Sequence, residues 1–473
     1  MQSCDVLIIG AGVIGTALAA RLSQTEVKVC VVDRAADVAD GASKGNAGVT
    51  SSYYSAPGTL EAKLTSASVF RWDDLCRRLN VPFRRIGALM PALDDAQLQG
   101  LVPQCEEARS CGVGAEILSR EETLEREPMI SPNCLGALYL PDEGIIDPMR
   151  LTYSFAELAA QNGAEIHFDN PVVGFERSDN RIVTAVTPRN SFKARYVVNC
   201  AGLHADVIST LAGGDEFRMW PRKGQYWVLD REFGARLGHI IFAAPSADTK
   251  GIHVVPTTRG SVLLGPTAKD GEDRDDKSTD QEMLAHAFAE AKRLVPEISL
   301  DFAIKSYAAL RPASLTPFFV RFDSRVPNLI HAVSRSIGVS TSIGIADYVL
   351  DLLKSGGLEA TDSGRCISEL PAMPLFRYMS DPSSMDQRDE TCRQIVCICE
   401  QVTAAEIRAA LTAKVPARSI EGVWKRTGAT GGRCQGTMCL MGVTFMCATH
   451  MNRPPEAVPF KDGAEVGIGR MCD

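Results

Sequence analysis

Four cysteines in the last fifth of the chain have types and spacing that suit a metal centre. Cys397 and Cys399 form a CxC pair, and Cys434 and Cys439 follow after a gap of 34 residues. Four thiolates are what the two irons of a [2Fe-2S] cluster require, although four cysteines can also hold a structural zinc ion. The CxC spacing and the long gap differ from the CxxC pairs of zinc ribbons. The quartet therefore predicts a metal centre, with an iron–sulfur cluster favoured over zinc.

A glycine-rich turn near the start of the chain has the spacing that cradles a dinucleotide. The string Gly10-Ala11-Gly12-Val13-Ile14-Gly15 follows an apolar strand pattern at 5–9 and precedes an alanine-rich helix pattern at 16–22. Gly10 permits a tight turn, Gly12 lets the backbone approach a pyrophosphate, and Gly15 lets the helix pack closely on its strand. The phosphates then lie at the positive N-terminus of the helix.

A second strand pattern, at 27–32, ends in an acidic residue where a dinucleotide site needs one. Asp33 stands where a carboxylate can accept a hydrogen bond from a ribose hydroxyl, and its neighbour Arg34 is assigned to the same site. Strand, turn, helix, second strand and acid occur in the order that predicts a Rossmann-like α/β fold. These elements alone do not separate NAD from FAD.

Three further stretches resemble the D-amino-acid-oxidase-like superfamily of flavoproteins. Residues 41–49 resemble its small-residue loop along the FAD, and residues 197–206 resemble the strand and turn that close over the cofactor. Residues 336–342 precede a helix expected over 344–353, whose start faces the flavin in that family, where amides and the helix dipole stabilise the charge of reduced flavin. The resemblance implies FAD as the cofactor. It assigns to FAD the residues Ser43, Asn46, Ala47, Gly48, Ala201, Gly202, Gly338, Val339, Ser340 and Thr341.

Chemistry at a flavin needs an anchor for the substrate and a group that takes a proton. Arg311 lies in a string that resembles the family's GLRP segment, whose arginine commonly grips a carboxylate or phosphate. A guanidinium is a planar fork of donors that suits either anion. His253 is the candidate proton acceptor because imidazole has a pKa near neutrality. The segment around His253 is similar to stretches of L-2-hydroxyglutarate and glycerol-3-phosphate dehydrogenases.

The cysteine-rich end resembles the bacterioferritin-associated-ferredoxin-like (BFD-like) [2Fe-2S] domain. The string from Arg433 to Cys439 carries the resemblance, and Thr403 with Glu406 forms a capping box that predicts a helix running to about Ala413. The resemblance implies that the cluster ligands are Cys397, Cys399, Cys434 and Cys439. Zinc remains the alternative.

The elements that must position these residues predict three units. The Rossmann-like FAD-binding domain is discontinuous, over 1–60, 145–215 and 325–360. Strand patterns at 225–229, 253–256 and 261–264 predict an α+β substrate domain with an antiparallel sheet, over 61–144 and 216–324. A linker at 361–390, a small and mostly helical BFD-like domain at 391–455 and a tail at 456–473 complete the expected order.

The net charge and the apolar content of the chain limit the kinds of molecule that it is expected to bind. A formal charge of −8 argues against nucleic acid, because phosphate binding needs clustered Lys and Arg. No apolar run is long enough to predict a membrane-spanning helix. We expect a cytoplasmic protein, with any contact to the inner face of the membrane made through a partner. The expected partners are a small anionic substrate and an electron acceptor, which is a quinone, a carrier protein or another redox subunit in a complex.

The combined layout resembles a group that includes the catalytic subunits of anaerobic glycerol-3-phosphate dehydrogenases and L-2-hydroxyglutarate-dehydrogenase-like proteins. It implies oxidation of a CH–OH group by hydride transfer to flavin N5, with electrons leaving through the [2Fe-2S] cluster. Glycerol-3-phosphate enzymes typically carry a histidine where this chain has Thr50-Ser51-Ser52, so the choice between a polyol phosphate and a 2-hydroxy acid stays open.

Two alternative functions also remain. One is an amine or amino-acid dehydrogenase of opine or proline type, which Gln225 and Arg311 fit as well. The other is an oxygen-reactive flavoenzyme whose C-terminal unit is a zinc-containing or metal-free binding module.

Overall fold

A parallel sheet carries the glycine turn. Its parallel strands lie in the order β9, β2, β1, β12, β20, and three further strands extend it in antiparallel pairs. The apolar runs of β1 and β2 fit strands that are buried on both faces. The strands are β1 (Gln2–Ile9), β2 (Val29–Val32), β9 (Glu165–His167), β10 (Gly174–Ser178), β11 (Arg181–Val186), β12 (Ser191–Asn199), β19 (Phe318–Phe322) and β20 (Leu329–Ser334).

Helices cover both faces of the parallel sheet. On one face α1 (Val13–Leu22) packs between α6 (Pro148–Gln161) and α10 (Gly338–Ser355), and α7 (Ala205–Ala212) lies on the other face. The expected start of α10, residue 344, is wrong, because the helix begins at Gly338. The hydroxyls of Thr341 and Ser342 donate to backbone carbonyls in the preceding turn, which satisfies these polar side chains inside the helix.

A second, mixed sheet carries the residues expected to meet the substrate. Its strands lie in the order β18, β13, β16, β15, β14, β5, β7, β6, and β17 follows β16 along the same edge of β13; only β14 and β5 run parallel. The strand predictions near 225–229, 253–256 and 261–264 are confirmed. The strands are β5 (Ala88–Ala92), β6 (Glu116–Ser119), β7 (Gly136–Leu140), β13 (Trp220–Leu229), β14 (Ile240–Ile241), β15 (His253–Pro256), β16 (Val262–Gly265), β17 (Lys269–Asp270) and β18 (Ala303–Ala313).

Helices and a small third sheet complete this region and join it to the parallel sheet. The helices α4 (Asp95–Ser110), α5 (Arg120–Arg126) and α9 (Gln281–Leu294) pack on the mixed sheet. In the third sheet β8 (Gly144–Ile146) pairs with β3 (Val49–Thr50) and with β4 (Phe83–Arg85). Two helices, α2 (Leu60–Val69) and α3 (Trp72–Arg78), connect β3 to β4.

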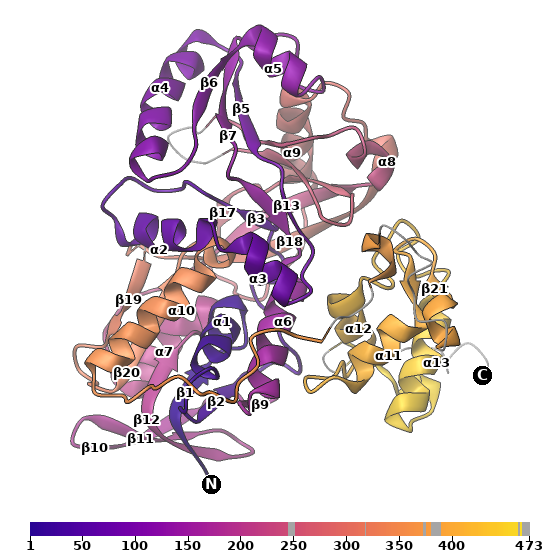
Figure 1. Cartoon of the computed structure of the whole chain (residues 1–473). Coiled ribbons are helices and arrows are strands. Elements are labelled where there is room, and N and C mark those ends of the chain that lie inside the picture. Colours follow the sequence, from indigo (N-terminus) through magenta and orange to yellow (C-terminus); the bar gives the residue numbers. More distant parts are fainter. Residues whose placement is uncertain (245–250, 317, 372–374, 380–388, 462–463, 466–473) are drawn as a thin grey trace.

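The C-terminal domain is small and mostly helical, as expected. It contains β21 (Ile395–Cys397), β22 (Val402–Thr403), α11 (Ala404–Thr412), α12 (Ile420–Thr427) and α13 (Leu440–Met451) around one apolar core. The predicted capping box of Thr403 and Glu406 is present. In Figure 1 this domain, coloured orange to yellow, lies beside the rest of the molecule, and α12 packs on α6.

The computed structural model describes residues 1–244, 251–316, 318–371, 375–379, 389–461 and 464–465. Parts of the expected linker (372–374 and 380–388) and tail (462–463 and 466–473) lie outside the described residues. A short hairpin of β23 (Pro459–Lys461) and β24 (Ala464–Glu465) falls within the expected tail. Among the described helices, none has the length and apolar character needed to cross a membrane.

Candidate active site and metal centre

The glycine turn between β1 and α1 is shaped by close backbone approaches. A Cβ at Gly15 would lie 1.9 Å from the carbonyl oxygen of Gly10, and a Cβ at Gly10 would lie 2.4 Å from that of Cys200. Gly10 also has a φ of +113°, which residues with side chains rarely adopt. A Cβ at Gly12 would meet only the Ser43 hydroxyl within 4 Å. The turn is therefore closed behind Gly10 and Gly15 and open at Gly12, which fits a bound pyrophosphate.

Asp33, at the end of β2, holds this turn in place. Its carboxylate accepts hydrogen bonds from the backbone N–H of Ala11 at 2.5 Å and of Ala35 at 2.8 Å. Burial raises the pKa of Asp33 more than the two hydrogen bonds lower it. Asp33 thus ties β2 to the glycine turn at the edge of the sheet where a ribose would lie.

The turn after β12 packs behind the glycine turn. The Cα of Ala201 lies 3.3 Å from the Cβ position of Gly10, and Gly202 has a φ of +54°. Arg34 is exposed. Burial, together with the positive charge of Arg34, lowers the pKa of His204 to about 4, so this imidazole is neutral at pH 7.

The loop over residues 41–49 contacts the N-terminus of α1. Ser43 Oγ accepts a hydrogen bond from the backbone N–H of Val13 at 3.0 Å. Further along, Asn46 Oδ1 accepts from the N–H of Gly48 at 2.7 Å, which fixes the bend at Ala47. The loop therefore runs from the pyrophosphate end of the expected FAD site toward the mixed sheet.

The first turn of α10 lies against the end of the same loop. Ser340 Oγ accepts from the N–H of Ser51 at 2.8 Å and lies 3.2 Å from the carbonyl oxygen of Val49, to which it donates. The expected cofactor residues of the loop and of Gly338 to Thr341 are thus brought together. The first turn of α10 is thus fixed to the backbone at Val49 and Ser51.

Arg311 lies in β18, on the face of the mixed sheet that meets this loop. Alternate residues of a strand share a face, so Tyr307, Ala309 and Arg311 point the same way. A Cβ at Gly45 would lie 2.3 Å from the Cβ of Ala309. The Nη2 of Arg311 donates to the carbonyl oxygen of Thr267 at 3.0 Å, while its buried Nε has no partner among the described residues. A buried guanidinium N–H without a partner is suited to an anionic ligand.

His253, at the start of β15, shares that face. It stands opposite Gly265 in β16, Gly265 packs on Tyr226 in β13, and Tyr226 stands opposite Tyr307 in β18. The Nδ1 of His253 accepts a hydrogen bond from the N–H of Ala243 at 3.2 Å, so a neutral ring carries its proton on Nε2. Two strands separate β15 from β18, which puts the backbones of His253 and Arg311 about 14 Å or more apart. Only their side chains can converge on one small substrate.

Gln225 is occupied by a structural contact. Its amide nitrogen donates to the carboxylate of Asp280 at 2.6 Å, and its amide oxygen accepts from the backbone N–H of Asp280 at 2.8 Å. Because Gln225 is fully buried and bonded at both ends of its amide, it does not support the amine-dehydrogenase alternative.

Glu143 is a buried carboxylate that no sequence motif indicates. One oxygen accepts from the backbone N–H of Ser52 at 2.7 Å and from its hydroxyl at 2.8 Å. The other oxygen, like the hydroxyl of nearby Thr50, is buried and has no partner within the described part of the chain. Burial raises the pKa of Glu143 to about 7. Glu143 therefore fixes the loop that follows β3, at Ser52.

The four cysteines of the C-terminal domain converge as two pairs. The thiols of Cys397 and Cys439 interact with each other, as do those of Cys399 and Cys434. All four cysteines are described, and no three of their sulfurs lie within 4.8 Å of one another. With Zn–S bonds of about 2.3 Å, a zinc tetrahedron would bring all four within about 4 Å. Two separated pairs fit a cluster of two metals better.

Backbone amides support the same interpretation. The N–H groups of Thr430, Gly436 and Met438 point at cysteine sulfurs. Donors on a glycine-rich loop offset the negative charge of thiolates and sulfides.

Both parts of the chain match known families. Residues 5–352 match the family of FAD dependent oxidoreductases called DAO, and residues 395–445 match the BFD-like [2Fe-2S] binding domain. The chain therefore belongs to the DAO family of FAD-dependent oxidoreductases. Its cofactors are FAD and a [2Fe-2S] cluster, and the expected resemblance to both families is confirmed.

The chain is also similar to individual proteins within these families. The chain is 36% identical over 443 residues to glycerol 3-phosphate dehydrogenase of Caloramator mitchellensis, covering 92% of each chain. It is 26% identical over 270 residues to L-2-hydroxyglutarate dehydrogenase of Escherichia coli K12, covering 56% of this chain and 64% of the other. The solved structure of dithionite-reduced L-alpha-glycerophosphate oxidase from Mycoplasma pneumoniae with FAD bound aligns with a TM-score of 0.74 and 28% identity, over 79% of this chain and 100% of the other.

Proposed function

We propose that this protein is an FAD-dependent dehydrogenase that oxidises a CH–OH group of a small anionic substrate. The substrate class is a polyol phosphate such as glycerol 3-phosphate or a 2-hydroxy acid such as L-2-hydroxyglutarate. The observation that carries the proposal is the buried, unpartnered Nε of Arg311, two residues along β18 from Ala309, which packs on Gly45 of the loop over residues 41–49. The similarity to a glycerol 3-phosphate dehydrogenase over almost the whole chain supports the same class.

The cofactors supply the electron chemistry: bound FAD accepts a hydride, and the cluster passes electrons on one at a time. The chain's own residues bind and orient the substrate. The guanidinium of Arg311 grips the phosphate or carboxylate, and the Nε2–H of His253 donates to the substrate hydroxyl oxygen. The hydroxyl proton leaves to water. His253 can accept it at Nε2 only in the tautomer that carries the ring proton on Nδ1, and that tautomer requires the hydrogen bond from Ala243 to break. We propose that FAD is held by the glycine turn, the loop over 41–49, Ala201, Gly202 and the start of α10.

The test is anaerobic reduction of the bound flavin by a panel of candidate substrates. Glycerol 3-phosphate, L-2-hydroxyglutarate, glycerol, L-proline and an opine are mixed with the purified protein, and the visible absorbance of oxidised FAD is followed. We expect bleaching by at least one hydroxylated anion and none by uncharged glycerol. Bleaching by the amines alone would contradict the proposal.

The proposed electron acceptor is a quinone, a carrier protein or a partner redox subunit, because a cluster delivers single electrons. Steady-state turnover is therefore expected to be faster with a one-electron dye or a quinone analogue than with oxygen. Stoichiometric hydrogen peroxide formation at the full rate would instead favour the oxygen-reactive alternative.

A further inference from the structure

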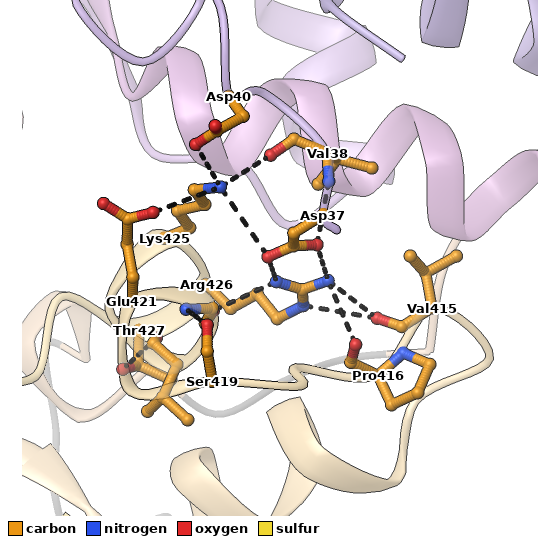
Figure 2. Close-up of polar contacts among 12 residues, drawn as sticks. Asp37, Val38, Asp40, Val415, Pro416, Ser419, Glu421, Lys425, Arg426 and Thr427 are labelled. Carbon is orange, nitrogen blue, oxygen red and sulfur yellow. Dashed lines mark hydrogen bonds and ion pairs between the residues drawn. The ribbon is translucent and has the colours of Figure 1, made fainter. Parts of the chain in front are cut away.

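Two adjacent cations of α12 are buried against the part of the chain that binds FAD. Lys425 and Arg426 are each 1% exposed. Figure 2 shows both side chains reaching from the C-terminal domain to Asp37 and Asp40, which follow β2. Long cationic side chains are almost never fully buried unless they are paired. The contact is therefore a specific junction between the two parts of the chain.

Arg426 and Asp37 form the centre of this junction. The guanidinium donates to both oxygens of the carboxylate at 2.8 Å, in the bidentate geometry that makes such pairs strong and directional. Although burial would raise it, the pKa of Asp37 is lowered by the charge of Arg426 and by these hydrogen bonds. Arg150 of α6 donates to the carbonyl oxygen of Arg426 at 2.9 Å, which adds a second tie between the domains.

Lys425 holds the next residues of the same loop. Its ammonium group donates to the carbonyl oxygen of Val38 and to Asp40 Oδ1, both at 3.1 Å. Lys44 joins the network by bonding both Asp40, at 2.6 Å, and Glu421 of α12, at 3.1 Å. Helix α12 thus contacts the stretch 37–44 at its start, middle and end.

The stretch 37–44 contains a strained residue and contacts the glycine turn on the side opposite α12. Ala39, between the two residues that Lys425 holds, has a φ of +61°, which a side-chain-bearing residue adopts only when its surroundings impose it. The N–H of Ala39 donates to the carbonyl oxygen of Ala11 at 3.1 Å. Four residues later, the Ser43 hydroxyl bonds the N–H of Val13 at the start of α1. The loop therefore lies between α12 and the backbone that cradles the pyrophosphate.

We propose that Lys425 and Arg426 are positioning residues of the FAD site. They hold residues 37–44 in the strained conformation that supports the glycine turn, so FAD affinity depends on the docked C-terminal domain. Because coupling between two binding equilibria is reciprocal, bound FAD must in turn tighten the docking of α12. The [2Fe-2S] domain then supports FAD binding in addition to the proposed transfer of electrons away from the flavin.

The test compares FAD release from the full-length holoenzyme and three variants. Arg426→Gln, Asp37→Asn and the double variant all remove the ion pair. Each single variant leaves one buried charge without its partner, whereas the double variant removes both charges. Glu157→Gln is a stringent control, because Glu157 of α6 bonds the N–H groups of Lys414 and Val415 in the C-terminal domain and Val415 in turn accepts from Arg426, yet in the described part of the chain Glu157 has no hydrogen bond to residues 37–44. FAD dissociation is followed by the rise in flavin fluorescence on dilution, and cluster absorbance checks that the domain stays folded.

We expect both single variants to release FAD at least tenfold faster, the double variant to be less impaired than the sum of the two, and Glu157→Gln to stay within twofold of the parent. Equal release rates for all proteins, or equal acceleration by Glu157→Gln, would overturn the proposal.

Hydrogen exchange on the unmodified protein gives a second test that needs no variant. Removal of FAD from the cluster-loaded chain should speed amide exchange in α12 by at least tenfold and leave α13 unchanged, because α13 lies farther from the rest of the molecule (Figure 1). Identical exchange of α12 with and without FAD would contradict the coupling even if every variant failed to fold.

Discussion

A Cβ on Gly45 would lie 2.3 Å from the Cβ of Ala309, so the loop over residues 41–49 and strand β18 are in direct contact. Ala309 is two residues from Arg311 and shares its face of the mixed sheet. The loop over residues 41–49 can approach the strand that carries Arg311, the proposed substrate anchor, this closely only because Gly45 has no side chain. A methyl group at Gly45 would have to push the loop away from the sheet.

Gly45→Ala is accordingly expected to weaken FAD binding at least tenfold. The added Cβ would also lie 3.3 Å from the Cα of Ala309, so rotation of a side chain cannot relieve the clash. The ratio of flavin to protein absorbance after gel filtration measures the loss. Partial recovery in Gly45→Ala/Ala309→Gly would identify the contact as the cause, whereas full flavin content in the single variant would contradict it.

Arg311→Ala should raise KM for the anionic substrate by about 100-fold, since charge-assisted hydrogen bonds contribute roughly 1.5 to 3 kcal/mol each. FAD content should be unchanged. Arg311→Lys keeps the charge but loses the fork, and an intermediate KM is expected. Kinetics equal to those of the parent protein would remove Arg311 from the substrate site.

His253 offers a sharper distinction between donating a hydrogen bond and accepting a proton. Because Ala243 already donates to Nδ1, we expect His253→Gln, whose amide can still donate, to lose about tenfold in kcat and His253→Asn to lose more. A general base contributes roughly 10²- to 10⁴-fold. A loss of that size in both variants, with disappearance of the acidic limb of the pH profile, would show that His253 takes the proton.

The glycine turn and the cysteine quartet can be predicted from sequence because local backbone geometry and ligand chemistry demand those residue types. Gly15 cannot carry a Cβ only 1.9 Å from a carbonyl oxygen. The start of α10 could not be predicted correctly, because serine and threonine usually signal a helix N-terminus, whereas Thr341 and Ser342 bond carbonyls within the helix.

The buried charges escape prediction for a different reason. Lys425 and Arg426 stand in the last turn of a helix, where exposed cations are common because they complement the helix dipole. Nothing local distinguishes them from such residues, since Asp37 lies almost 400 positions away. Glu143 likewise acquires its role only when β3 pairs with β8.

Glu143 should make the stability of the protein pH-dependent. Its pKa is raised from 4.5 to about 7 in the folded chain, so between these values the unfolded state releases a proton that the folded state keeps. The contribution of Glu143 to the free energy of unfolding is fully present below pH 4.5. It falls by on the order of 3 kcal/mol as the pH rises through 7. Urea unfolding at several pH values should show this loss relative to Glu143→Gln. Parallel pH curves for the two proteins would rule it out.

Cys434→Ser separates the two halves of the reaction. Cys434 is half-buried and receives backbone hydrogen bonds from Gly436 and Met438. A serine oxygen is a poor ligand for the soft iron–sulfur core, so we expect loss of cluster absorbance and of electron delivery to dyes or quinones. Flavin bleaching by substrate under anaerobic conditions should persist within about threefold, because Lys425 and Arg426, which hold residues 37–44 beside the glycine turn, are unchanged in this variant. Cys447→Ser is the matched control, since Cys447 is buried in the apolar core of the same domain and is not among the four converging thiols. Turnover with external acceptors that survives in Cys434→Ser would show that electrons leave directly from the flavin.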